Sequence, residues 1–242
     1  MQDLLTKGID EKGNIRDEKT HKFKDSPLGR IPKEWEVVRL GELCKFKNGI
    51  NFSQDEKSNN GILTLDVLNM YSENIAVDFN NAYRVNKKVS ANYLLQKRDI
   101  LFVRSSVKRE GIGWTSLFNG FSEPTTFCGF IIRGRIFEKD VLSEYIVYYF
   151  RSEKVRNNLI SLSGQLAITN ISQEMLCKIL LPLPPLPEQQ RIAEILSQID
   201  QTIEKEEQYK EKLERLKQGL MEDLLTGKVR VNHLIKEGVK NV

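Results

Sequence analysis

The chain has 242 residues, of which 40% are hydrophobic and 29% charged, a composition typical of a globular protein with a sizeable core. Its 37 basic and 33 acidic residues give a net charge of only +4, so a nucleic-acid surface has to come from local clustering of cations. Three separated cysteines exclude a disulfide framework and a CxxC-type zinc site. No stretch approaches the roughly 18 apolar residues of a membrane span, so we expect a soluble, cytoplasmic protein with no membrane partner.

The first part of the chain predicts a polar arm followed by a domain rich in strands. Residues 1–30 show little apolar periodicity, and Trp35–Leu40 predicts the first strand. Short apolar, β-branched runs predict further strands at Ile62–Val67, Ile100–Val103 and Phe127–Ile132. The spacing of Leu142–Asn158 predicts a helix. Because strands come in runs with few helices between them, we expect residues 31–181 to form an α+β domain on a mostly antiparallel sheet.

A basic segment inside this domain, Tyr83–Trp114, contains a loop whose chemistry suits DNA. A strand leads there into arginine, serine, lysine and glycine, which offer guanidinium groups, hydroxyls and backbone N–H groups to phosphates and to guanine. Basic loops are also common on proteins that bind no DNA, and that alternative stays open. The predicted DNA contacts of this loop are Arg104, Ser105, Ser106, Lys108 and Arg109.

Two further polar loops are candidates for DNA contacts. The amide edges of Gln165 and Asn170 match adenine, but Asn170 or Ser172 can instead cap a short helix that starts near Gln173. Asn48, followed by glycine, can equally form only a turn. The predicted contacts from these two loops are Lys47, Asn48, Gln165, Thr169 and Asn170.

A proline-rich segment separates the domain from a long helix. Four prolines in residues 182–187 predict an extended, stiff hinge, with a ligand for a polyproline-binding domain as the alternative. Residues 188–226 carry an apolar seam of period about 3.5, which predicts a coiled-coil-type helix roughly 55–60 Å long, and residues 227–242 form a tail. The helix either folds back on its own domain or pairs with a second long helix, and we favour pairing. The predicted pairing residues are Ile192, Ile195, Ile199, Tyr209, Leu213, Leu216 and Leu220.

The two ends of the chain carry similar sequences. The segment Met1–Ile9, MQDLLTKGI, recurs 220 residues later as Met221–Val229, MEDLLTGKV. The match is short and rich in leucine, so coincidence is the alternative. A genuine repeat makes the polypeptide one unit, plus overlap, of a longer tandem array.

The sequence offers few groups for catalysis. Its only histidines, His21 and His233, lie in polar terminal segments, which argues against a histidine triad and a His-rich metal site. It has no GxxxxGK[ST] phosphate loop, no GxGxxG turn after a strand, and no Asn/Asp-Pro-Pro-aromatic motif of amino-methyltransferases. A hidden pair of catalytic carboxylates is the remaining alternative. We therefore expect a protein that is not an enzyme and that holds no cofactor and no metal.

Five segments together resemble the specificity subunit of type I restriction–modification systems. The hinge into the long helix, PLPPLPEQQRIA, is the most specific of them, and the resemblance covers nearly the whole chain. In chain order the segments are Phe23–Trp35, Asp99–Ser105, Gln165–Ser172, Leu181–Ala193 and Leu220–Lys228.

The resemblance implies sequence-specific binding of double-stranded DNA without catalysis. A full subunit of that family has two target-recognition domains, each followed by a long helix, and the helices pair antiparallel so that each domain binds half of a split sequence. The implied partners are a DNA adenine methyltransferase (modification) subunit and a restriction/translocase subunit. With one domain and one helix, this chain is expected to be a half-sized subunit that forms a homodimer on an interrupted palindrome, with half of a hetero-pair or a truncated gene product as the alternatives. The alternative is a coiled-coil scaffold that joins protein partners without DNA readout.

Overall fold

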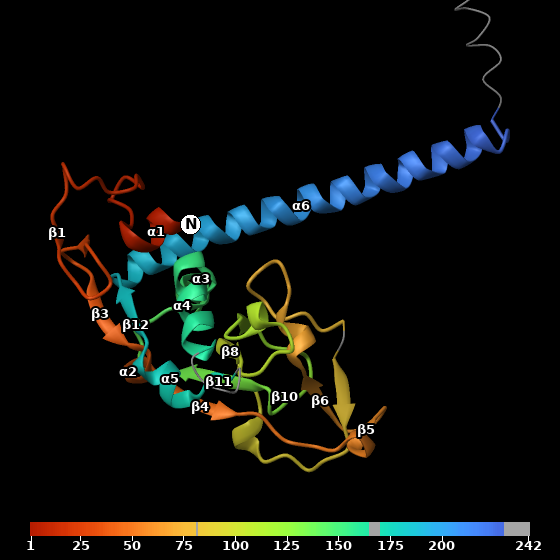
Figure 1. Cartoon of the computed structure of the whole chain (residues 1–242), viewed down its shortest axis with the longest axis horizontal. Coiled ribbons are helices and arrows are strands. Elements are labelled where there is room, and N and C mark those ends of the chain that lie inside the picture. Colours follow the sequence, from red (N-terminus) through yellow and green to blue (C-terminus); the bar gives the residue numbers. More distant parts are fainter. Residues whose placement is uncertain (81, 165–169, 230–242) are drawn as a thin grey trace, which may run out of the picture. The chain divides into compact units, whose positions relative to one another are not determined.

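A computed structural model gives the arrangement of residues 1–80, 82–164 and 170–229 (Figure 1). The chain divides into two units, Met1–Ser197 and Gln198–Val242, with the boundary inside the last helix. The helices are α1 (Gln2–Thr6), α2 (Leu40–Leu43), α3 (Ser143–Arg151), α4 (Glu153–Gly164), α5 (Gln173–Lys178) and α6 (Leu186–Leu225). The strands are β1 (Phe23–Lys24), β2 (Ile31–Pro32), β3 (Glu36–Arg39), β4 (Cys44–Asn48), β5 (Lys57–Ser58), β6 (Ile62–Leu65), β7 (Tyr83–Val85), β8 (Asp99–Val103), β9 (Thr115–Phe118), β10 (Thr125–Phe127), β11 (Ile131–Ile136) and β12 (Leu180–Leu183). None of the described helices is long and apolar enough to cross a lipid bilayer.

A four-stranded antiparallel sheet, in the order β4-β11-β8-β9, is the centre of the first unit. A second sheet, in the order β10-β6-β7-β5, is antiparallel except where β10 runs parallel to β6. Two smaller sheets pair β1 with β2 and β12 with β3. The predicted α+β fold with mostly antiparallel pairing is confirmed.

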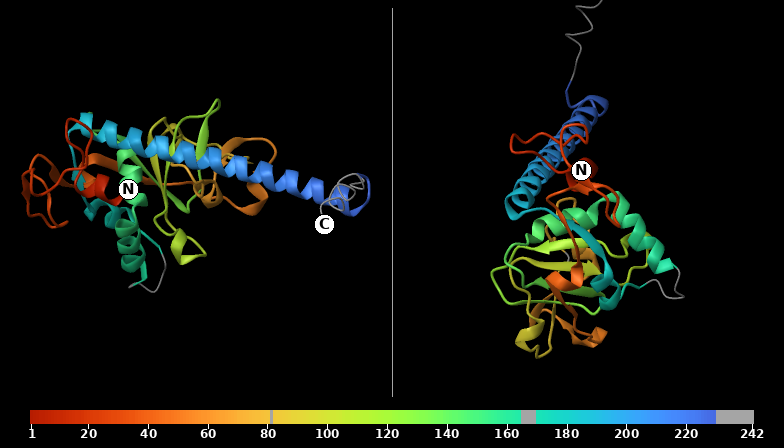
Figure 2. Two further views of the ribbon diagram at one scale, coloured as in Figure 1. Left: turned by 90° about the horizontal axis from the view of Figure 1, so that it is seen from above. Right: turned by 90° about the vertical axis from the view of Figure 1, so that its left-hand side faces the viewer.

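Strand β8 is buried on both faces, which explains its uninterrupted apolar sequence. Alternate residues of a strand point to opposite sides. Ile100 and Phe102 accordingly pack into one core cluster, while Leu101 and Val103 pack into another. Helix α3 covers the first cluster by packing against β8 and β9, and the right-hand view of Figure 2 shows the green helices over the sheet. One strand therefore joins the two halves of the core.

Two predicted elements are each divided in the structure. The predicted helix Leu142–Asn158 breaks at Ser152, whose backbone is extended (φ −63°, ψ 143°), so α3 and α4 lie on either side of it. The predicted strand Phe127–Ile132 is split because Phe127 ends β10 in the second sheet and Ile131 begins β11 in the central sheet. Both breaks allow neighbouring apolar residues to serve different packing surfaces, which local spacing does not reveal.

The N-terminal arm, which the sequence predicted only as a polar segment, begins with a docked helix. In α1 the side chains of Leu4 and Leu5 are buried, and so is Ile9 beyond the helix end. These residues share a core cluster with Ile192 and Leu196 of α6. A helix this short is unstable in isolation, so packing against α6 is what forms it.

The proline-rich hinge is held by a strand pairing and by one buried glutamine. Strand β12 pairs antiparallel with β3 in a two-stranded sheet, where Pro182 can be tolerated because each strand has a free edge. Gln189 is fully buried and accepts a hydrogen bond from the Leu142 N–H at 2.9 Å. Its Nε2 donates to two backbone carbonyls, at 3.0 and 2.8 Å. These bonds fix the turn into α6, which begins at Leu186, two residues before the predicted start.

One carboxylate joins the arm, the region before β3 and the base of α6. Glu188 accepts hydrogen bonds from the Trp35 indole N–H and from the Ile9 backbone N–H, both at 3.0 Å. Arg16 forms a two-pronged ion pair with the same carboxylate, and its Nη2 lies 3.1 Å from Oε2. The side chains of Arg16 and Glu188 are only 13% and 10% exposed. Both charges are thus shielded from water and depend on each other for compensation.

The substitution Glu188→Ala tests this anchor. We expect it to lower the free energy of unfolding by about 3 kcal/mol, because the shielded Arg16 guanidinium loses its counter-charge and Trp35 its acceptor. Urea unfolding followed by circular dichroism measures the change. Glu194→Ala, at an exposed position of the same helix, is the matched control and should cost less than about 0.5 kcal/mol. Equal stabilities of the two variants would contradict the anchor.

Candidate nucleic-acid interface

The predicted DNA-contact loops meet at one end of the central sheet. Strands β4 and β8 both pair antiparallel with β11, so they run in the same direction and end at the same edge. Asn48 is the last residue of β4, and Arg104 follows the last residue of β8. The turn into β11 lies beside Arg104, whose N–H donates to Phe130 O at 2.8 Å. We call this surface the recognition edge and define it as Asn48, Arg104–Arg109, Gly129–Phe130 and Asn170.

Backbone hydrogen bonds attach the loop that contains Asn170 to the loop Arg104–Arg109. Ser105 and Asn170 form an isolated antiparallel bridge, and the Ile171 N–H donates to Arg104 O at 3.0 Å. The two loops were predicted separately as DNA contacts, and nothing in their sequences indicated that they touch. The bridge places the side chains of Ser105 and Asn170 on neighbouring backbone segments.

Asn48, at the end of β4, is attached to helix α5 through a pair of side-chain amides. The side-chain amides of Asn48 and Gln173 are joined by a hydrogen bond of 2.9 Å. Helix α5 begins directly after Ser172, whose hydroxyl accepts the Met175 N–H at 3.1 Å. The cap of this helix is therefore Ser172, which leaves the Asn170 side chain outside the capping interaction.

The polar groups of the recognition edge are partly fixed and partly exposed. Arg104 donates from Nη1 to Gly129 O at 3.3 Å, and Ser106 Oγ lies 3.1 Å from the hydroxyl of Tyr71. Lys108 and Arg109 are exposed. The edge thus presents two exposed cations next to side chains that are already held in place by hydrogen bonds.

The remaining predicted contacts are Lys47, which lies within β4, and two residues that the structure does not describe. The Nζ of Lys47 lies 4.1 Å from the centre of the Tyr93 ring, where the ring face attracts its charge. Lys47 also stands opposite Arg133 in the pairing of β4 with β11. Gln165 and Thr169 lie outside the described residues.

An apolar pocket of about 700 Å³ opens beside the recognition edge. Leu68, Tyr71 and Phe130 line it with 66%, 40% and 59% exposure, and Val107 is fully exposed. Sequence analysis missed the first three because single apolar residues in loops carry no periodic signal. An apolar surface next to serine and lysine side chains suits a base edge that carries a methyl group, as thymine does.

Two of the cysteines are buried and unreactive. Burial raises the pKa of the Cys44 thiol to about 12, and the neighbouring Cys177 adds to the shift. Burial also raises the pKa of Cys128, with a further contribution from the Asp66 carboxylate. Thiols with such shifts stay protonated at neutral pH and are poor nucleophiles. Within residues 1–80, 82–164 and 170–229, no three His, Cys, Asp or Glu side chains are grouped to hold a metal ion.

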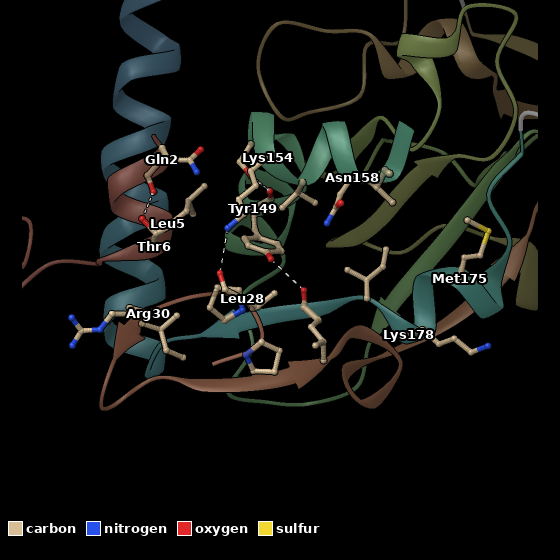
Figure 3. Close-up of a pocket in the computed structure, with 18 residues that line it drawn as sticks. Gln2, Leu5, Thr6, Leu28, Arg30, Tyr149, Lys154, Asn158, Met175 and Lys178 are labelled. Carbon is tan, nitrogen blue, oxygen red and sulfur yellow. Dashed lines mark hydrogen bonds between the residues drawn. The ribbon is translucent and has the colours of Figure 1, made fainter. Parts of the chain in front are cut away.

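A second cavity, of about 450 Å³, lies away from the recognition edge where the arm meets α4 and β12. Figure 3 shows Leu5 and Thr6 of α1 on one side of it and Tyr149 and Lys154 on the other. The Lys154 ammonium donates to Leu28 O at 3.3 Å and Tyr149 to a backbone carbonyl of β12 at 3.2 Å. The arm is therefore attached at the rim of this cavity.

Comparison with known proteins gives a consistent family. The family described as type I restriction modification DNA specificity domain matches residues 32–215. The chain is 31% identical over 238 residues to the type I restriction enzyme MjaVIII specificity subunit of Methanocaldococcus jannaschii, a match that covers 97% of this chain and 53% of that protein. It is 27% identical to the type I restriction enzyme EcoKI specificity subunit of Escherichia coli, over 83% of this chain and 44% of the other.

The fold is shared with a solved structure of an HsdS subunit. The crystal structure of the HsdS subunit from Thermoanaerobacter tengcongensis matches with a TM-score of 0.57 at 20% identity, over 83% of this chain and 47% of that one. The chain spans about half the length of the curated relatives it matches. From the extent of the family match, the chain belongs to the family of type I restriction–modification DNA specificity domains.

Proposed function

We propose that the chain is the DNA specificity subunit of a type I restriction–modification complex and recognises half of a bipartite target without catalysing a reaction itself. The observation that carries the proposal is the convergence of Asn48, Arg104–Arg109 and Asn170 at one end of the central sheet. Three loops that meet on a rigid sheet can follow a groove, which a single basic loop cannot do. The family to which the chain belongs is defined by DNA specificity, and this supports the same conclusion.

The groups of the recognition edge divide into two roles. Exposed cations such as Lys108 and Arg109 suit phosphates, which position a protein on DNA without reading its sequence. Arg104 and Asn170 have the donor and acceptor pattern for guanine and adenine edges. Phe130, beside Arg104, supplies apolar surface for a thymine methyl group. We assign sequence preference to these last three residues.

The second unit supports the formation of a homodimer through α6. Several apolar side chains of the predicted seam are 46–62% exposed: Ile199, Tyr209, Leu213, Leu216 and Leu220. Exposed apolar residues at heptad spacing are typical of a helix that pairs with another. Two of the predicted pairing residues contact the first unit instead. Ile192 is fully buried in the core of that unit, and Ile195 packs against the same core. The pairing face therefore begins at Ile199.

Pairing two copies about a two-fold axis gives two recognition edges and hence an interrupted palindrome as target. In this proposal a DNA adenine methyltransferase subunit docks on the dimer and flips an adenine out of the duplex for methylation. A restriction/translocase subunit joins the same complex, which acts on DNA in the cytoplasm. The names of the relatives, all specificity subunits of type I restriction enzymes, support these partners.

The double substitution Lys108→Ala with Arg109→Ala tests the recognition edge. Binding to a labelled duplex, measured by fluorescence anisotropy between about 50 and 200 mM salt, should weaken, and the slope of log K against log salt should become shallower by about 2 because two phosphate contacts are lost. The matched control replaces Lys33 and Lys139, two other exposed lysines, by alanine. Lys139 lies beyond the opposite end of β11. Identical slopes for both double variants would place the DNA elsewhere.

The substitution Leu216→Asp tests the pairing face. We expect the dimer dissociation constant, measured by analytical ultracentrifugation, to rise about 100-fold or more, because the two-fold axis places the charge twice in an apolar seam. Gln218→Asp introduces the same charge at an exposed polar position and should leave dimerisation nearly unchanged. A wild-type chain that is monomeric both alone and with its methyltransferase partner would contradict the homodimer.

A further inference from the structure

The C-terminal end of α6 repeats the local structure of α1 as well as its sequence. Thr6 and Thr226 each donate a hydroxyl hydrogen bond to the carbonyl four residues earlier. Both helices then end at a glycine with positive φ, 65° at Gly8 and 72° at Gly227, although the glycine comes one residue earlier in the second segment. This left-handed conformation is the usual way to close a helix. The similarity of the two segments therefore extends from sequence to local structure.

The two segments differ in whether their apolar side chains are covered. Leu5 and Ile9 are 2% and 3% exposed, whereas the matching Leu225 and Val229 are 81% and 51% exposed. Side chains that drive docking at the first segment are thus left in water at the second.

The first segment occupies the base of α6, the stretch Glu188–Leu196. The Ile9 N–H donates to Glu188 Oε1 at 3.0 Å, and Leu4 and Leu5 belong to the core cluster that contains Leu196. Ile9 bonds Glu188 near the start of α6, whereas the N-terminus of the chain lies beside a later turn of that helix (Figure 1). Helix α1 therefore runs antiparallel to α6. A helix in the place of α1 would have the direction of the partner helix in an antiparallel two-fold pair of α6 helices.

Helix α1 holds this place with little structure of its own. It has five residues and no side-chain cap at its N-terminus. Leu5 and Thr6 also line the cavity of about 450 Å³ (Figure 3). A five-residue helix has to be ordered when it docks, whereas Met221–Leu225 belongs to a 40-residue helix that is already formed. Docking of Met221–Leu225 therefore requires less ordering than docking of α1, which favours replacement of α1 by the end of the long helix.

We propose that Met221–Val229 of a second copy replaces Met1–Ile9 at the base of α6, so that two copies exchange helix ends. The inference rests on the proposed pairing through α6 and gives that pairing a register. With Val229 of one copy opposite Glu188 of the other, the two-fold axis crosses the helices between Gln208 and Tyr209. If α1 keeps its place, the partner helix stops short of the base, and the axis moves toward the C-terminal end of α6.

Disulfide mapping along α6 tests this register. The full chain carries Cys177→Ser, and one new cysteine is introduced per variant at an exposed position. Mild oxidation links a cysteine to its own counterpart only where the two face each other across the axis. We expect Tyr209→Cys to cross-link about tenfold faster than Leu216→Cys. The positions to be compared are Glu206, Tyr209, Leu213 and Leu216.

Amide hydrogen exchange of α1 gives an independent readout. Exchange over Leu4–Ile9 should become about tenfold faster or more on dimerisation, because the segment loses its place. Leu225→Asp removes an anchor of the incoming helix and should slow both the Tyr209→Cys cross-link and the exchange. Leu68→Asp, at a similarly exposed apolar position near the recognition edge, is the control and should change neither.

The outcomes separate this inference from the proposed dimer. A cross-link that is fastest at Leu216→Cys, with Leu4–Ile9 still protected, keeps the dimer and overturns the exchange of helix ends. The absence of a cross-link at all four positions overturns both.

Discussion

The carboxylate of Glu188 is the contact on which the geometry of the first unit depends. It joins Ile9, Arg16 and Trp35, each at least 153 positions away in the chain. A charge that is 10% exposed is stable only with partners of this kind. The next residue, Gln189, uses its amide in the same way to fix the hinge. Two consecutive side chains thus determine where α6 begins and how its first turns are held against the core.

The geometry of the recognition edge is likewise fixed by a few contacts with the core. Strand β8 is buried on both faces and cannot change its direction without disturbing two core clusters. The backbone at Arg104, directly after β8, is therefore placed by the core, and the bridge from Ser105 to Asn170 extends this rigidity to a third loop. Side chains held in this way lose little conformational freedom on binding, which favours affinity and selectivity. Exposed Lys108 and Arg109 add charge without requiring such precision.

Local patterns in the sequence were sufficient for strand β8, for the mostly antiparallel α+β class and for the long helix, but not for β4 and β9. The apolar run at residues 100–103 and the seam after the proline-rich hinge have the spacing that their structures require. Local spacing did not reveal α1, because a polar arm gives no sign that Leu4 and Leu5 will find apolar neighbours on α6. It also missed the role of Glu188, whose partners lie at the other end of the chain. The candidate loops were found by their chemistry, but their convergence depends on the direction of β4 and β8, which sequence spacing does not encode.

We propose that the chain selects a DNA sequence and that two copies do so symmetrically. Selection of bound molecules from a randomised duplex pool by the wild-type chain with the proposed adenine methyltransferase partner, followed by sequencing, is the direct test. We expect enrichment of an interrupted palindrome whose two half-sites are identical and separated by a spacer of fixed length. Absence of any enriched sequence would contradict DNA recognition and favour a scaffold role, and a single undivided motif would contradict the symmetric pair.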